Sequence, residues 1–352
     1  MARILYAVHG TGHGHAIRAL TVARRLREHD LLFISHGAGL ELLRPEFPVE
    51  DCPSLVTVIK AHKVAGAATV RANLRILLQS RAVLERLHDI IKHFRPEVAL
   101  TDYEFFLPRV CRRLGLPCLS LDHQHVLTCC RHPVPLSRRP ASLVTRQVVA
   151  RLFSRADAFL VTSFFRPPLK PGLDNVRLLP PLLRETVLQR RPEPGGHVVA
   201  YQGYATFRRF FPFLRAIPRE VRVYGFEREG REGNLIFKRP SEAGFLDDLA
   251  SCAYVVCGGS HSLLSEALYY GKPVLSFPIR NAFEQYLNAF YLERLGFGLA
   301  CTGFRPKPTL ISTFEERLPH FRAAIAAGHF LGNPEILSHL HHFIRHHTLP
   351  PV

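Results

Sequence analysis

Short apolar runs alternate with amphipathic segments along the whole chain. Runs of this length, bounded by glycine, proline or polar residues, predict buried strands of a parallel sheet. They lie at 3–8, 31–35, 97–101, 117–121, 158–162, 175–179, 197–201, 221–224, 235–238, 253–257 and 274–277. The intervening segments, including 16–29, 208–217 and 309–327, carry the apolar spacing of helices. The alternation therefore predicts an α/β protein built on parallel sheets.

Two of the predicted helices are strongly basic. One spans 69–93 and places Arg71, Arg75 and further basic residues on its polar side, and the other spans 142–155. Such a face is either simply solvated or directed at an anionic surface such as a membrane or an acidic acceptor. Both interpretations stay open at this point.

The segment Arg190–Gly196 combines proline, glycine and charge, which is typical of a domain boundary. We therefore predict an N-terminal domain over 1–190, a linker over 191–196 and a second domain over 197–330. A chain of 352 residues is long enough for two such domains.

The overall charge predicts an anionic partner, because the chain has a formal net charge of +17. Acidic lipids, nucleotide sugars and nucleic acid are all anionic partners of this kind. The sequence has no RNA-recognition signature and no zinc-finger spacing, so nucleic acid is not expected. The eight cysteines form no C-x-x-C pair and are expected to be buried thiols, with a metal site at Cys129–His132 as the minor alternative. No signal peptide or membrane span is recognised, which predicts a cytoplasmic protein.

The stretch 257–278 predicts the end of a strand, a glycine turn, a helix and a second strand, in that order. Gly258 and Gly259 permit a tight turn, and Ser260 is expected to cap the helix that follows. A helix that begins at the carboxyl end of a parallel strand directs free N–H groups at an anion, so this is a candidate phosphate or diphosphate site. Glu266, further along the helix, is a candidate to hold ribose hydroxyls.

A second glycine loop, His9 to His15, follows the first strand. His13 and His15 are candidates for a general base, because imidazole titrates near neutral pH. Asp102 and Glu104 follow a neighbouring strand and are the alternative bases, or they orient the histidine. Candidate chemistry also follows the next strand, at Asp122, Gln124 and His125.

The C-terminal half resembles the donor-binding half of GT-B glycosyltransferases. The resemblance rests on GG, Ser260, Glu266-Ala267, G-x-P, Pro278, Glu284-Gln285, Asn288-Ala289 and a G-x-G at 296–298. It implies that the turn and helix start hold the nucleotide diphosphate, that Glu266 holds the ribose, and that Glu284 and Gln285 face the donor sugar. The segment Ser260-His261-Ser262 departs from relatives, which often carry an aromatic residue and a threonine there.

The N-terminal half resembles the same superfamily. Its first loop is similar to that of the bacterial enzyme that adds N-acetylglucosamine to a lipid-linked muropeptide, with His15 in the place of the loop histidine. Thr-Asp-Tyr-Glu at 101–104 and Leu-Asp-His-Gln-His at 121–125 resemble a little-characterised bacterial and archaeal subfamily. The resemblance implies two Rossmann-like domains with parallel sheets facing a central cleft, and a last helix (331–352) that packs back on the first domain.

The resemblance also implies roles for further residues. Expected near the donor are Gly12, Gly14, Gln202, Gly203, Phe237, Lys238, Gly258, Gly259, Ser260, His261, Ser262, Glu266, Glu284 and Gln285. Expected on the acceptor side are His13, Arg18, Asp122, Gln124 and His125.

These features predict a hexosyl- or N-acetylhexosaminyl-transferase that uses a nucleotide sugar, with UDP as the expected nucleotide. No metal or other cofactor is expected. Inversion is favoured because Val274 occupies the position where many retaining GT-B enzymes carry a second glutamate. The alternatives are a UDP-N-acetylglucosamine 2-epimerase or nucleotide-sugar hydrolase on the same fold, and a non-catalytic basic protein that binds membrane or nucleic acid.

Overall fold

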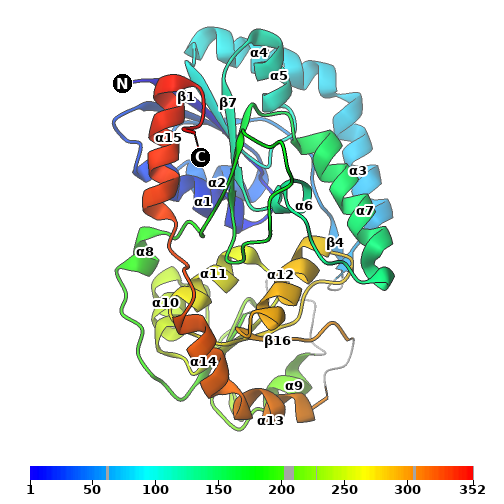
Figure 1. Ribbon diagram of the computed structural model, residues 1–352, viewed down its shortest axis with the longest axis vertical. Coiled ribbons are helices and arrows are strands. Elements are labelled where there is room, and N and C mark those ends of the chain that lie inside the picture. Colours follow the sequence, from blue (N-terminus) through cyan, green and yellow to red (C-terminus); the bar gives the residue numbers. More distant parts are fainter. Residues whose placement is uncertain (61–62, 202–209, 227, 304–306, 352) are drawn as a thin grey trace. The chain divides into compact units, whose positions relative to one another are not determined.

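The computed structural model describes residues 1–60, 63–201, 210–226, 228–303 and 307–351. The chain divides into two compact units (Figure 1). Unit 1 comprises Met1–Val58, Ala65–Arg184 and Leu331–Val352, and unit 2 comprises Ile59–Val64 and Glu185–Phe330. Each unit is built around a seven-stranded sheet with helices on its faces.

The sheet of unit 1 is wholly parallel, with strand order β3-β2-β1-β6-β7-β8-β9. Its strands are β1 (Arg3–Val8), β2 (Asp30–Ser35), β3 (Val49–Asp51), β6 (Val98–Asp102), β7 (Cys118–Asp122), β8 (Ala158–Thr162) and β9 (Val176–Leu179). Since β1 pairs with both β2 and β6, residues far apart in sequence meet at its carboxyl end, where Val8 lies opposite Asp102.

Alternate side chains of β1 pack into two different hydrophobic cores, as expected for a strand covered on both faces. Ile4 and Tyr6 pack with α1 (His13–Arg24) and α15 (Asn333–His346), whereas Leu5 and Ala7 pack with α4 (Ser80–Phe94) and α5 (Leu107–Leu114). The remaining helices of unit 1 are α2 (Gly37–Leu43), α3 (Gly66–Leu78), α6 (Val126–Cys129), η1 (Leu136–Arg138), α7 (Arg139–Val148) and the π-helical turn η2 (Val149–Phe153).

The sheet of unit 2 has the order β12-β13-β11-β10-β14-β15-β16 and is parallel except for β12. Its strands are β10 (Val198–Tyr201), β11 (Val221–Tyr224), β12 (Gly230–Glu232), β13 (Leu235–Phe237), β14 (Tyr254–Cys257), β15 (Val274–Ser276) and β16 (Gly298–Ala300). Its helices are α8 (Glu185–Leu188), α9 (Phe211–Arg215), α10 (Glu242–Ser251), α11 (His261–Tyr269), α12 (Phe283–Arg294), α13 (Thr309–Glu316) and α14 (Leu318–Ala326). A small hairpin of β4 (Ile59–Lys60) and β5 (Lys63–Val64) also belongs to unit 2, where Val64 N–H donates to Arg280 O at 3.0 Å.

The predicted strands are confirmed to within a residue or two, but three of the predicted helices are wrong in extent. The segment 69–93 is two helices, because the chain leaves helical geometry at Gln79 between α3 and α4. The segment 142–155 begins earlier, at Arg139, and closes in the π-helical turn. The segment 309–327 is likewise divided, into α13 and α14.

The chain passes from unit 1 to unit 2 at Arg184–Glu185, ahead of the predicted linker at 191–196. Side chains fasten that linker to unit 2. Arg190 Nε donates to Asp247 Oδ1 at 2.7 Å, and Lys272 Nζ donates to Glu193 O at 2.6 Å. The proline- and glycine-rich segment is therefore part of the surface of unit 2 rather than a tether.

Candidate active site

The loop after β1 is held tightly against the loop after β2. A Cβ on Gly10 would lie 1.9 Å from the carbonyl oxygen of His36, so only glycine fits. Gly10 N–H also donates to His36 Nε2 at 3.2 Å. Gly12, with φ of 80°, then turns the chain into α1, which begins at His13. This turn places His15 in the first turn of α1, at the carboxyl edge of the sheet.

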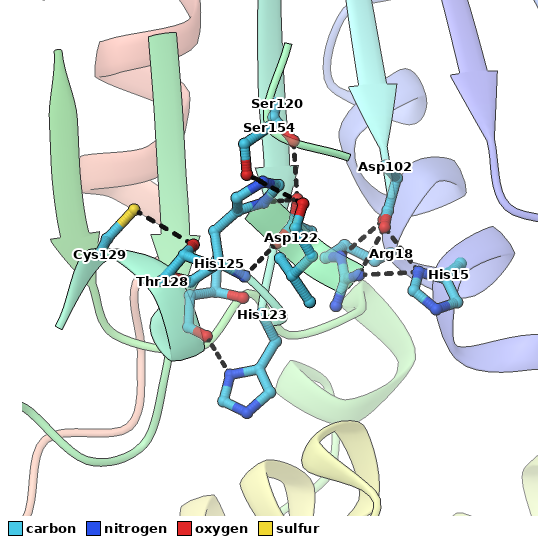
Figure 2. A network of polar contacts seen from close by, with 12 residues as sticks. His15, Arg18, Asp102, Ser120, Asp122, His123, His125, Thr128, Cys129 and Ser154 are labelled. Atoms are coloured by element: carbon cyan, nitrogen blue, oxygen red, sulfur yellow. Dashed lines mark hydrogen bonds and ion pairs between the residues drawn. The ribbon is translucent and has the colours of Figure 1, made fainter. Parts of the chain in front are cut away.

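His15 and Asp102 form a short hydrogen-bonded pair, as Figure 2 shows. His15 Nδ1 lies 2.6 Å from Asp102 Oδ1, and Asp102 is fully buried while the His15 side chain is 15% exposed. A carboxylate accepts from Nδ1–H, which leaves the lone pair of a neutral imidazole on Nε2. The arrangement is therefore that of a general base oriented by an acid.

Arg18 clamps the same carboxylate. Its Nε donates to Asp102 Oδ2 at 2.7 Å and its Nη2 donates to Asp102 Oδ1 at 2.6 Å. Burial opposes the charged guanidinium, but the charge and hydrogen bonds of Asp102 outweigh it and raise the pKa of Arg18. In Figure 2 the guanidinium lies between Asp102 and Asp122. Arg18, which is predicted on the acceptor side, binds Asp102 and fixes the plane of its carboxylate.

Two aromatic rings, those of Tyr103 and His9, lie against the His15 imidazole. Tyr103, which has an unusual φ of 52°, stacks on His15 with centroids 5.9 Å apart and on Phe153 with centroids 3.9 Å apart. His9 meets His15 edge-on at 5.1 Å. Burial, followed by the neighbouring His15 and His36, holds the pKa of His9 well below its usual range, so His9 is neutral. No role is predicted from the sequence for Tyr103 or His9, although both adjoin the predicted site residues.

Glu104 serves as a helix cap. Its carboxylate accepts from Phe106 N–H at 2.9 Å, Leu107 N–H at 2.7 Å and Ser54 Oγ at 2.6 Å, at the start of α5. Three donors to one buried carboxylate engage both oxygens and stabilise the helix start. The geometry therefore favours His15 over Glu104 as the base.

Asp122 and His125 form a second buried pair. Asp122 Oδ2 accepts from His125 Nδ1 at 2.7 Å and from Ser120 Oγ at 2.6 Å, and His125 Nε2 lies 3.0 Å from Ser154 Oγ. Burial opposes ionisation of Asp122, but the charge and hydrogen bonds of His125 outweigh it and lower the pKa of Asp122. Both residues are almost completely buried and Gln124 is nearly so, whereas His13 is exposed. Of the predicted acceptor-side residues, only His13 thus presents its side chain openly to solvent.

In unit 2, side chains of α12 hold the turn after β14 by hydrogen bonds. A Cβ on Gly259 would lie 2.5 Å from the carbonyl oxygen of Gln285. The side-chain oxygen of Gln285 accepts from Gly259 N–H at 3.3 Å and Ile279 N–H at 3.0 Å, and Asn288 Nδ2 donates to Gly259 O at 2.9 Å. Gln285, expected to face the donor sugar, uses its amide oxygen to hold the turn.

Helix α11 begins after Ser260 as predicted, and its N-cap differs from the prediction in one detail. Ser260 is the N-cap residue, as predicted, but its side chain makes no capping hydrogen bond. Ser260 is exposed and Ser262 half-buried, while His261 is buried with its Nε2 3.4 Å from Ser265 Oγ. Glu266 is buried one and a half turns along α11, and Glu284 is half-buried in the first turn of α12.

Comparison with known proteins decides the family. A family model described as glycosyl transferase family 1 matches residues 2–319. The chain belongs to this glycosyl transferase family. An uncharacterized glycosyltransferase of Methanosarcina acetivorans is 23% identical over 350 residues, which cover 89% of each chain.

Solved structures of low identity share the fold of this glycosyltransferase. MurG of Acinetobacter baumannii is 14% identical, with a TM-score of 0.62 over 96% of this chain and 99% of MurG. The Streptomyces glycosyltransferase SsfS6, solved with thymidine diphosphate, is 15% identical, with a TM-score of 0.58 over 97% of this chain and 99% of SsfS6. The fold is GT-B, with one Rossmann-like sheet in each unit.

Two predicted donor contacts of the glycosyltransferase, Phe237 and Lys238, lie at the end of β13 and directly after it. The Phe237 side chain is fully buried in the core of unit 2, with its ring 5.4 Å from that of Phe211, so that side chain does not line a site for the nucleotide base. Lys238 directly follows β13 and is half-buried. Gln202 and Gly203 lie outside the described residues.

Among the described residues of the glycosyltransferase, one group has the donor atoms for a metal: Glu28, His29 and His341, all in unit 1. Its hydrogen bonds disfavour that use. Ala2 N–H donates to His29 Nδ1 at 3.0 Å, so a neutral His29 carries its proton on Nε2, the nitrogen that faces Glu28. At Cys129 and Cys130, burial raises the pKa of the thiols to about 11 and about 12.

Proposed function

We propose that this glycosyltransferase moves a hexosyl or N-acetylhexosaminyl group from a UDP-linked sugar to an acceptor hydroxyl, with inversion and without a metal ion. The observation that carries the proposal is the pair of His15 and Asp102, joined at 2.6 Å with the imidazole partly open to solvent. Such a pair is suited to removing a proton from a hydroxyl at neutral pH.

In the proposed reaction His15 Nε2 takes the proton of the acceptor hydroxyl. The acceptor oxygen forms a bond to the anomeric carbon while the bond from that carbon to the diphosphate oxygen breaks. The diphosphate leaves with the bonding electron pair. Asp102 stabilises the imidazolium that forms, and Arg18 keeps Asp102 in the orientation this requires.

The start of α11 is the proposed site of the diphosphate. The N–H groups of the first turn of a helix point toward its N-terminus, and the helix dipole favours negative charge there. These groups supply the electrostatic stabilisation of the leaving group that a metal ion supplies in other enzymes. Glu266 is the proposed partner of the ribose hydroxyls, as the family resemblance implies.

The proposal is tested by following donor turnover with water as acceptor, using UDP-glucose and UDP-N-acetylglucosamine and NMR detection of the released sugar. We expect the β anomer to appear first from these α-linked donors, and the rate to stay within about twofold in excess EDTA. Initial release of the α anomer would contradict inversion, and loss of turnover in EDTA would contradict metal independence. Full conversion of the donor to its 2-epimer would establish the epimerase alternative.

A further inference from the structure

The apolar side chains exposed on unit 1 are concentrated on two helical segments. On α3 they are Val70, Leu74, Leu77 and Leu78, and on η1 and α7 they are Leu136, Leu143, Val144 and Val148. Leu78 is 78% exposed, Leu136 75% and Val70 68%. In the view of Figure 1, α3 and α7 run along the same edge of unit 1. We call these eight residues the apolar patch.

The way α3 is fastened explains why its apolar side faces outward. Thr69 Oγ1 accepts from Val58 N–H at 3.0 Å, and Asn73 pairs with both Val56 N–H and Val56 O. Thr69 and Asn73 are one turn apart and therefore define the inner face of the helix. Val70, Leu74, Leu77 and Leu78 lie on a different face, and no residue of α3 is fully buried.

Helix α7 is built in the same way. Ser142 and Val149 are buried, whereas Leu143 and Val144 are 60% and 64% exposed. Leu143, Val144 and Val148 share one side of the helix, because Val148 follows Val144 by four positions and Leu143 is adjacent to Val144. The outward side of α7 is thus apolar, as it is on α3.

The two chain segments that carry the patch contain basic residues and no acidic ones. The sequence contains no aspartate or glutamate from Cys52 to Leu84, nor from His123 to Ala156. These two acid-free segments contain the whole patch and also carry basic residues of unit 1: Arg71, Arg75, Arg81, Arg131, Arg138, Arg139, Arg146, Arg151 and Arg155. Arg71, Arg75 and Arg139 are exposed.

We propose that the apolar patch docks unit 1 on the surface of an anionic lipid bilayer. An amphipathic helix that combines exposed leucine and valine with arginine inserts its apolar side at the boundary between headgroups and acyl chains, while the arginines meet lipid phosphate. None of the helices in the part of the chain that the structure describes is long and apolar enough to cross a membrane, so the association is peripheral. This inference concerns a surface outside the catalytic residues and does not rest on the proposed reaction.

The test is flotation of the full chain with vesicles of phosphatidylcholine alone or mixed with phosphatidylglycerol. We expect partitioning to be about tenfold or more stronger on the anionic vesicles and to weaken as salt rises. The variants Leu74→Glu/Leu78→Glu and Leu143→Glu/Val144→Glu should each lose about tenfold or more of that partitioning. Arg71→Glu/Arg75→Glu should lose a similar amount.

Matched controls carry the same substitutions elsewhere. Leu114→Glu and Leu295→Glu change leucines that are 44% and 41% exposed outside the patch, and Arg112→Glu/Arg113→Glu reverses two exposed arginines on α5. These variants should bind as the wild type does. Failure of the wild type to bind anionic vesicles overturns the proposal. Full binding by both leucine variants also overturns it, since a purely electrostatic surface, such as one for nucleic acid, would then be indicated.

Discussion

Replacing His15 by alanine lowers kcat for donor turnover by about 10³-fold, the usual range for loss of a general base. Nucleotide affinity should be unchanged, because the effect lies in proton removal and not in donor binding. His15 is partly exposed and its side chain fills no core, so the fold should tolerate the change. The measurement is steady-state turnover beside calorimetric binding of the nucleotide.

The control for this prediction is His88→Ala, which removes an exposed histidine on α4 and should keep full turnover. An activity of His15→Ala close to that of the wild type would rule out His15 as the base. In that case Asp102, which is bonded to both His15 and Arg18, becomes the residue to test.

Replacing Gly259 by alanine should damage the donor half of the protein. The new methyl group would lie 2.5 Å from the carbonyl oxygen of Gln285 and 2.7 Å from its Cβ, so the turn or the start of α12 has to move. Overpacking of this kind costs about 1–3 kcal/mol of the free energy of unfolding. Because the same turn leads into α11, nucleotide affinity should also fall about tenfold or more, or about 1.4 kcal/mol.

Gly196→Ala is the matched control in unit 2, since a Cβ at that glycine meets no atom within 4 Å. It should change the denaturation midpoint and the nucleotide affinity very little. Wild-type stability and affinity in Gly259→Ala would show that the turn is looser than the contacts with Gln285 indicate.

Much of the fold could be predicted because a buried parallel strand has a plain sequence pattern. β1, β8 and β11 begin and end at the predicted residues. β3 and β16 were missed, because three residues at the edge of a sheet carry too little apolar periodicity to stand out.

The residues of the site could be named from the sequence, but not their partners. His15 and Asp102 are 87 positions apart and meet only because β1 lies beside β6 in the sheet order. Strand order depends on the packing of the whole sheet, which no local pattern encodes. The commitment of Arg18 to Asp102 and of Gln285 to the glycine turn could not be predicted for the same reason.

The exposed apolar side of α3 shows a further limit of the pattern. The spacing of Val70, Leu74 and Leu77 predicts a helix with an apolar face, and the usual expectation is that such a face packs on a core. In the structure Thr69 and Asn73 bind the preceding loop instead and turn the apolar face away. Periodicity identifies an apolar face but not what covers it.

The most direct test of the central claim, that unit 2 binds the nucleotide part of a sugar donor, is calorimetric titration with UDP, GDP, TDP and NAD. We expect one nucleoside diphosphate, UDP by preference, to bind at about micromolar level. Glu266→Ala should weaken that binding about tenfold or more, while Glu293→Ala, which removes an exposed carboxylate of α12, should not. Failure of all the nucleoside diphosphates to bind would show that unit 2 is not a nucleotide site, and equal affinity in Glu266→Ala would show that Glu266 does not hold the ribose.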